Sequence, residues 1–451
     1  MQSCADEART GDCGRAASWV GLGVALLLVG LAVALPQLTE WQVYSHANPG
    51  AEDVPPLHSL WEPKLGPGTL PAVAIAALGW RYARAWSEHL PWPRLLAVVC
   101  VAGLAWLLAL ACVDGSAGIS RVLGNPYEYL ETARATDDVS AMLHDYVDRI
   151  PYAAPDNWVT HVAGHPPGAL LFFVVLDRLN LAGDLSAGLI VTSLAASTPI
   201  AVLVTLRALG AEVSARRAAP FLVLGPAAVW TAVSADALFA AVAAWGLATL
   251  ALAATSRRRD VMVAWSALAG GLLGYCVMMS YGLPLLGLLA VAVLVAARAW
   301  EPFVMAALSA TTVVLAFAAG GFALWEAFPV LHERYWDGVA ADRPAAYWMW
   351  ANLAALVLCG GPLLGAGLAR LAVRRCEAER AVVLLVGAAV IAIAIADLSR
   401  MSKGEVERIW LPFVHWLLLS TALLPERWRQ SGLALQVGVA LALQHLLYTS
   451  W

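Results

Sequence analysis

Residues Asp156–Gly168 read DNWVTHVAGHPPG and lead directly into the apolar segment Ala169–Leu176, which reads ALLFFVVL. A polar loop meets a membrane segment here, where structure alone calls only for aromatic and basic anchors. Pro166 and Pro167 favour the first turn of a helix, so the pair predicts a helix start with His165 just outside it. The histidines of this corner either take part in chemistry or are merely hydrated at a rigid junction.

The amino-acid composition predicts an all-α polytopic membrane protein. Of 451 residues, 61% are apolar and only 13% are charged, and the mean hydropathy is +0.70. These values lie far outside the range of soluble globular proteins. The net charge of -4 is spread through the loops without a basic patch, which argues against a nucleic-acid partner.

Thirteen apolar runs are long enough to cross about 30 Å of hydrocarbon. They cover residues 19–36, 71–87, 94–113, 185–206, 218–233, 236–255, 261–278, 282–298, 303–325, 346–372, 380–397, 409–424 and 432–448. One further run, 167–182, is short and ends in two charged residues.

Charge decides how this short run is placed. Arg81, Arg84 and Arg94 put the loop between the second and third runs in the cytoplasm, so the loop 114–166 lies outside. If the runs 167–182 and 185–206 together cross the membrane only once, the arginine clusters later in the chain also lie on the cytoplasmic side. We therefore expect thirteen crossings, with 167–182 a short or partly inserted helix at the outer face, a cytoplasmic N-terminus and an external C-terminus.

The long external loop carries two candidate general bases. Apolar and aromatic residues recur at helical spacing through Tyr127–Arg149, which predicts one or two amphipathic helices on the outer membrane surface. Asp114 and Glu128 would both lie at the membrane boundary. Such a carboxylate is ordinarily solvated, but in a shielded pocket its pKa rises toward neutrality, which suits a general base.

Asp236 lies in a turn between two apolar runs that leave hardly any loop. An acidic residue at the edge of the hydrocarbon is costly and is a functional candidate by default. The structural alternative is that Asp236 caps the N-terminus of the following helix.

The last external loop carries three cations, Arg400, Lys403 and Arg408, on the side where few are expected. Their placement calls for an anion, and a lipid phosphate suits the bidentate guanidinium group. The alternative is simple pairing with Glu405 and Glu407.

A further external loop, His332–Trp348, mixes aromatic residues with Arg334, Asp337, Asp342 and Arg343. Aromatic residues at this depth are expected as an interfacial belt. Because the faces of sugars also stack on such rings, the loop could close over a carbohydrate.

Together these features resemble the glycosyltransferase C (GT-C) superfamily, and most of all its branch of protein O-mannosyltransferases and the lipid A aminoarabinose transferase. The residues that carry the resemblance are Glu128 between Tyr127 and Tyr129, the corner His165-Pro166-Pro167, the turn Ser234-Ala235-Asp236-Ala237, and Arg408 followed by Leu411-Pro412. The chain departs from the pattern at the loop acid, normally an Asp directly after the first core span, so that Asp114 and Glu128 both remain candidates.

The resemblance covers about residues 94–424, which would form a GT-C-like catalytic core. Residues 1–93 would add an N-terminal tail, two further membrane helices and a proline-rich external loop, and residues 425–451 a C-terminal membrane helix. The implied activity is inverting transfer of one sugar from a polyprenyl phosphate, at the outer face of the cell membrane. The acceptor would be a cell-envelope glycan, lipid or protein.

In this interpretation Glu128 or Asp114 deprotonates the acceptor hydroxyl, with Asp236 as a third candidate. The donor phosphate is held by His161, His165, Arg400, Lys403 and Arg408, with Tyr127 also in the substrate site. No cofactor is required by the sequence, although a divalent metal ion, which some members of the superfamily use, remains compatible with it.

Two other classes of protein compete with this interpretation. A transporter or flippase of a lipid-linked saccharide would show internal repeats and charges near the bilayer midplane, neither of which the sequence displays. A membrane metalloenzyme could use His161 and His165, whose i, i+4 spacing suits a metal site on a helix. Gly164 and Pro166 argue against a regular helix through both histidines.

Overall fold

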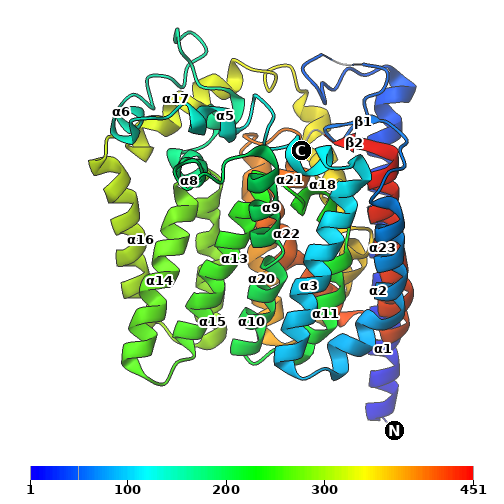
Figure 1. Cartoon of the computed structure of the whole chain (residues 1–451). Helices are drawn as coiled ribbons and strands as arrows, with labels where there is room; N and C mark the ends of the chain where they lie inside the picture. The colour runs from blue at the N-terminus through cyan, green and yellow to red at the C-terminus, as the bar shows by residue number, and fades with distance from the viewer. Residues whose placement is uncertain (1, 49, 450–451) are drawn as a thin grey trace.

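The computed structural model describes residues 2–48 and 50–449, and this part of the chain folds almost entirely into helices (Figure 1). The body of the bundle consists of α1 (Gln2–Thr39), α2 (Thr69–His89), α3 (Trp92–Ala111), α9 (Asp184–Ala195), α10 (Thr198–Ala208), α11 (Glu212–Leu224), α13 (Ala235–Ala254), α14 (Arg259–Val277), α15 (Leu286–Ala297), α16 (Glu301–Ala319), α18 (Ala345–Gly360), α19 (Leu363–Arg374), α20 (Arg380–Leu398), α22 (Leu411–Leu417) and α23 (Glu426–Leu446). Shorter elements connect them: η1 (Cys112–Asp114), α4 (Ala117–Ser120), α5 (Tyr129–Arg134), α6 (Val139–His144), α7 (Thr160–Gly164), α8 (Pro167–Arg178), α12 (Ala228–Thr231), η2 (Leu283–Leu285), α17 (Leu324–Trp336), α21 (Val406–Ile409) and η3 (Leu418–Leu423).

The chain is an all-α, multi-pass membrane protein. Within the described residues, seven helices are long and apolar enough to cross a membrane, or up to eight if a bent pair is counted as one span. The seven are Gly14–Thr39, Trp92–Asp114, Asp184–Ala208, Ala235–Ala254, Arg259–Val277, Glu301–Ala319 and Arg380–Leu398, and the bent pair is α18 with α19, which meet at 103°.

The expected thirteen crossings are not confirmed, because several apolar runs do not form long helices. The run 282–298 yields α15, which has only 12 residues and so spans about 18 Å. The run 218–233 is interrupted at Gly225-Pro226, between α11 and α12. Hydropathy counts such runs as spans, but a buried helix inside a large bundle has the same composition.

The short helices of the long loop gather at one end of the bundle. Figure 1 shows α5, α6, α8 and α17 together at its upper end, while α1 begins at the lower end. Residues Tyr127–Arg149 contain two separate helices of 6 residues each, α5 and α6, rather than one long surface helix. The run 167–182 forms the expected short helix, α8, of 12 residues.

Helix α13 forms the centre of the bundle, since 78% of its apolar window is buried. Its N-terminus carries Asp236, and the N-cap is Ser234, whose Oγ accepts a hydrogen bond from the Ala237 N–H at 3.1 Å. The capping role that the sequence allowed for Asp236 therefore belongs to Ser234, which leaves the Asp236 carboxylate available to another partner.

A two-stranded antiparallel sheet joins the beginning and the end of the chain. Strand β1 (Ser59–Trp61) pairs with β2 (Leu447–Thr449), with Leu60 opposite Tyr448. The loop between α1 and α2 is thereby joined to the end of α23, and helices α2 and α23 pack beside each other.

Candidate functional site

The histidine corner is held in place by backbone hydrogen bonds from its neighbours. Tyr146 is buried, and its hydroxyl donates to the carbonyls of Val162 at 2.8 Å and His165 at 3.1 Å. At the start of α8, the Gly168 N–H donates to Met278 O at 2.7 Å. A Cβ atom at Gly168 would lie 2.3 Å from that oxygen, so the close approach requires glycine.

Arg408 lies at the centre of a buried cluster of polar side chains. Its Nη1 donates to Asp236 Oδ2 at 2.7 Å, and its Nη2 donates to Glu405 Oε2 at 2.8 Å and lies 3.1 Å from His161 Nε2. His161 Nδ1 in turn lies 2.8 Å from Glu128 Oε1. Residues from α5, α7, α13 and α21, far apart in the sequence, therefore meet at the upper end of the bundle.

The hydrogen bonds assign the tautomer of His161. A guanidinium group can only donate, so the Arg408 contact requires His161 Nε2 to accept. In a ring with one N–H the proton then resides on Nδ1, which lies 2.8 Å from Glu128 Oε1. His161 therefore lies between Arg408 and the Glu128 carboxylate.

Glu128 presents one oxygen atom that no group in the described part of the chain occupies. The residue precedes α5 as its N-cap and is only 3% exposed. Its Oε1 lies 2.8 Å from His161 Nδ1, and its Oε2 is buried without a hydrogen-bond partner among the described residues. A buried carboxylate oxygen without a donor is costly, so it indicates a place where a ligand hydroxyl or a water would bind.

Glu405 joins this cluster to a second arginine, Arg343. Glu405 adopts a left-handed conformation with φ of 61°, and its Oε1 accepts from Arg343 Nη2 at 3.1 Å. Burial by itself raises the pKa of Glu405, but the neighbouring His58, Arg408 and Arg343 hold it well below its usual value. The preceding Gly404 has φ of 86°, and a Cβ there would lie 2.9 Å from Arg343 Nη1.

His165 is arranged as a hydrogen-bond acceptor rather than as a cation. Its Nδ1 lies 2.9 Å from His161 O, and because a carbonyl oxygen only accepts, Nδ1 must donate. In the neutral ring, Nε2 is then an acceptor. Burial lowers the pKa of His165, which favours this neutral form. The ring therefore suits an acceptor hydroxyl better than a phosphate.

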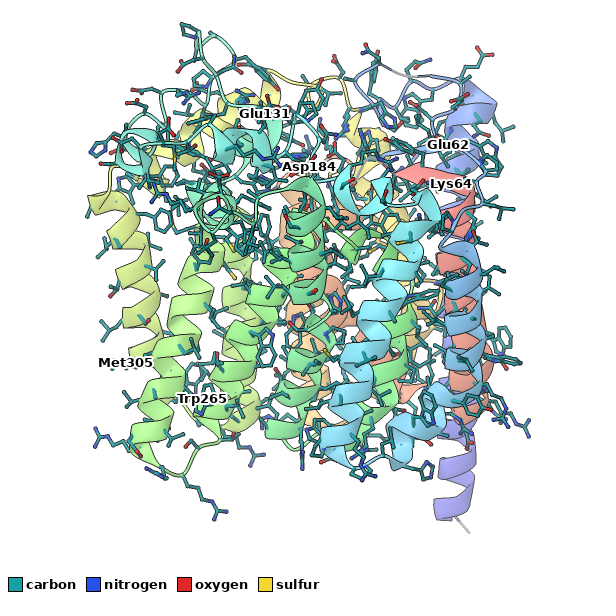
Figure 2. All side chains as sticks on the ribbon, viewed as in Figure 1. Glu62, Lys64, Glu131, Asp184, Trp265 and Met305 are labelled. Atoms are coloured by element: carbon teal, nitrogen blue, oxygen red, sulfur yellow. The ribbon has the colours of Figure 1, made fainter. Side chains whose placement is uncertain are left out.

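Asp114, the other candidate base, belongs to a different cluster. Its Oδ1 lies 2.9 Å from Lys64 Nζ, and its Oδ2 accepts from Lys64 at 3.1 Å and from Gln444 Nε2 at 3.2 Å. Figure 2 shows Lys64 beside the strands, whereas Glu131 of α5 lies toward the opposite side of the upper end. Both oxygens of Asp114 are thus occupied, and the structure does not bring this residue to Arg408.

The remaining predicted cations and Tyr127 occupy different environments. Lys403 is buried, and its Nζ donates to Arg343 O at 2.8 Å and lies 4.5 Å from the centre of the Trp336 ring. Arg400 and Tyr127 are exposed. The pairing alternative therefore describes Arg408 with Glu405, whereas Glu407 accepts from the backbone N–H of His58 instead.

A pocket of about 190 Å³ opens beside the cluster. Its walls come from α7, from α17 and the loop after it, and from the loop 401–405. Arg334 and Arg343 stood out in the sequence only as members of the loop His332–Trp348, and Glu405 only as a pairing partner of the cations. The i, i+3 spacing of Glu405 and Arg408 was the one local signal that could have drawn attention to Glu405.

Neither a metal centre nor a known relative adds to this description. No group of three or more His, Cys, Asp or Glu residues in the described part of the chain could hold a metal ion. Comparison with protein-family models, with curated proteins and with solved structures finds no match.

Proposed function

We propose that this protein is a membrane glycosyltransferase that moves a single sugar from a polyprenyl-phosphate donor to an acceptor hydroxyl on the extracytoplasmic side. The observation that carries the proposal is the Glu128 carboxylate, which is buried beside His161 and has no hydrogen-bond partner at Oε2 among the described residues. A general base needs such an acceptor atom within reach of the substrate proton. The resemblance to the GT-C superfamily supplies the reaction class, with residues 94–424 as the proposed core.

In the proposed reaction, the acceptor hydroxyl donates its proton to Glu128 Oε2 while its oxygen attacks C1 of the donor sugar. The bond between C1 and the phosphate oxygen breaks, and its electron pair leaves with the polyprenyl phosphate. A new glycosidic bond forms with inversion at C1. His161 Nδ1 lies 2.8 Å from Oε1, the other oxygen of the same carboxylate.

Among the three candidate acids, the contacts favour Glu128. Both oxygens of Asp114 accept hydrogen bonds from Lys64 or Gln444, so a substrate hydroxyl would have to compete with them. Asp236 forms an ion pair with Arg408, so its carboxylate already has a charged partner. We therefore assign Asp236 to the positioning of Arg408.

The donor phosphate would be stabilised by Arg408, Lys403 and Arg400, as electrostatic stabilisation of a leaving group requires. Arg408 already binds Asp236 and Glu405, so its contribution is a fixed positive charge rather than a freely rotating side chain. His161 and His165 would then contact the sugar and the acceptor, and Tyr127 would lie at the exposed edge of the site.

The extracytoplasmic side is supported by the distribution of arginines. The turn that carries Arg257–Arg259 joins α13 to α14 at the lower end in Figure 1, opposite to α5 and α17. Under the positive-inside rule the lower end is cytoplasmic, so the cluster would face outward.

The proposal is tested by sugar transfer and by the glycans of the cell envelope. Purified full-length protein in detergent should transfer a sugar from at least one of a panel of polyprenyl-phosphate sugars, and a deletion strain should lack one sugar residue in mass spectra of its envelope glycans. Unchanged envelope glycans together with no transfer from any donor would overturn the proposal. ATP- or gradient-dependent movement of an intact lipid-linked saccharide would instead support the flippase alternative.

A further inference from the structure

Three buried cations line the pocket beside the Glu128 cluster. Arg334, Arg343 and Lys403 are 6%, 5% and 3% exposed, and all three belong to its walls. The pocket contains a single carboxylate, Glu405, which is shared between Arg343 and Arg408. No carboxylate of the described residues forms an ion pair with Arg334 or Lys403. The pocket therefore holds more positive than negative charge.

The hydrogen bonds of Arg334 and Lys403 orient these two cations without neutralising them. Arg334 donates to the backbone carbonyls of Ile150 and Trp158, and Lys403 donates to the carbonyl of Arg343. Carbonyl dipoles satisfy the N–H groups but carry no net charge. Removal of a cation from water costs free energy that only a counter-charge offsets well, so this arrangement calls for an anion.

The crowding of positive charge is also evident in the Lys403 ammonium group. Burial lowers its pKa, and Arg343 and Arg400 lower it further. Burial likewise lowers the pKa of Arg334. A bound anion would relieve this repulsion, and it would be held most tightly where these side chains converge.

We infer that the pocket formed by α17, the loop after it and the loop 401–405 binds a phosphate group through Lys403, Arg343 and Arg334. Its assignment to the phosphate of the lipid donor rests on the proposed function. Glu405 lines the pocket and also accepts from Arg408, and Thr160 and Gly164 line it on either side of His161 in the sequence. A phosphate here would therefore lie next to the Glu128 cluster.

Binding of simple probes to the full-length protein tests the inference without any need for sugar transfer. Dodecyl phosphate, inorganic phosphate and uncharged dodecanol would be titrated by isothermal calorimetry in a non-ionic detergent. We expect dodecyl phosphate to bind the wild-type protein, and Lys403→Gln to weaken this binding at least about tenfold, since a hydrogen bond to a charged group contributes about 1.5–3 kcal/mol. Lys403→Arg, which keeps the charge, should retain most of the affinity.

The matched control is Arg178→Gln, which removes one exposed cation from the C-terminal end of α8 at the same end of the bundle. It should leave the affinity for dodecyl phosphate unchanged. If Lys403→Gln fails to fold, Val339→Glu provides a second variant, because it places a carboxylate on a half-buried wall of the pocket and should weaken binding as well.

The three probes distinguish the sources of the anion. Tighter binding of dodecyl phosphate than of inorganic phosphate assigns the pocket to a lipid phosphate, whereas equal binding assigns it to a free phosphate. Equal affinity of dodecanol and dodecyl phosphate, or equal loss in Lys403→Gln and Arg178→Gln, would overturn the inference. A protein that binds dodecyl phosphate through Lys403 but transfers no sugar would keep the anion site and refute the proposed function.

Discussion

Glu128 and Asp114 are both acids of the same end of the bundle, but they have opposite surroundings. One oxygen of Glu128 lies 2.8 Å from His161 Nδ1, and the other has no hydrogen-bond partner among the described residues. Asp114 is enclosed by Lys64 and Gln444, which bind both of its oxygens. Whether a carboxylate can accept a proton from a substrate therefore depends on its hydrogen-bond partners. The position of the acid along the chain does not reveal these partners.

The two clusters also differ in what they connect. The partners of Asp114 come from the loop before α2 and from α23, next to the β1–β2 sheet that joins that loop to the end of α23. The partners of Glu128 lead through His161 to Arg408 and then to Glu405, which lines the pocket of about 190 Å³. The Asp114 cluster thus links two segments of the fold, whereas the Glu128 cluster lies next to a pocket that a ligand could enter.

The largest effect is expected from Glu128→Gln. Loss of a general base lowers rates by about 10²- to 10⁴-fold, so sugar transfer should fall by that factor while binding of the donor is largely retained. The amide keeps the size of the side chain, so thermal unfolding should change little. Steady-state transfer assays measure the effect, and Glu131→Gln, an exposed carboxylate of α5, is the matched control. Full activity of both Glu128→Gln and Asp114→Asn would refute the mechanism.

Arg408→Ala should produce the second largest effect, mainly on stability. It leaves the buried carboxylates of Asp236 and Glu405 without their shared cation, and breaking such a pair costs about 3–5 kcal/mol. Denaturant unfolding in detergent would measure this loss. In the protein that remains folded, donor binding should weaken more than acceptor preference changes. The reverse order would move the phosphate site away from this cluster.

Asp114→Asn should destabilise the protein without impairing transfer. The substitution leaves the largely buried Lys64 ammonium without its ion pair, which we expect to cost about 1–3 kcal/mol. Gln444→Ala, which removes the neutral partner, should cost less. The unfolding free energies of both variants and their transfer rates would be compared with those of the wild-type protein. If Asp114→Asn lost as much sugar transfer as Glu128→Gln, the assignment of different roles to the two acids would be wrong.

The smallest effect concerns a third acid, Glu407, whose Oε1 accepts from the His58 N–H. Burial raises its pKa to about 7. Between its ordinary pKa of 4.5 and 7, the folded protein therefore keeps a proton that the unfolded chain releases, so stability falls as the pH rises through this window. Glu407→Gln removes this pH-dependent contribution to stability. The melting temperature of Glu407→Gln minus that of the wild type should therefore increase as the pH rises from 4.5 to above 7. A difference that stays constant with pH would contradict the raised pKa of Glu407.

Several features of the fold were predictable because they depend on local properties of the chain. The apolar composition predicts a membrane protein, and Pro166-Pro167 predicts the start of α8. The number of spans was not predictable from hydropathy. The helix α15 is as apolar as a membrane span but only 12 residues long, and the run 218–233 breaks at Gly225-Pro226.

The candidate site was predictable only in part. Glu128, His161, Asp236 and Arg408 stand out because polar residues at a membrane boundary are costly. The capping role allowed for Asp236 falls to Ser234, because its hydroxyl lies at the position that accepts from the third helical N–H. Arg343 could not be assigned, since its partners Tyr44 O, Lys403 O and Glu405 lie on segments distant in sequence.

The sequence by itself determined that this chain is a helical membrane protein and that its unusual polar residues gather at loop boundaries. Hydropathy, proline and charge act locally, and they are visible in any single segment. Only the tertiary structure decided that Asp114 pairs with Lys64, that Glu128 keeps an open oxygen, and that three buried cations share one pocket. Hydrogen bonds and charge balance depend on which distant segments pack together, and this information is distributed over the whole chain.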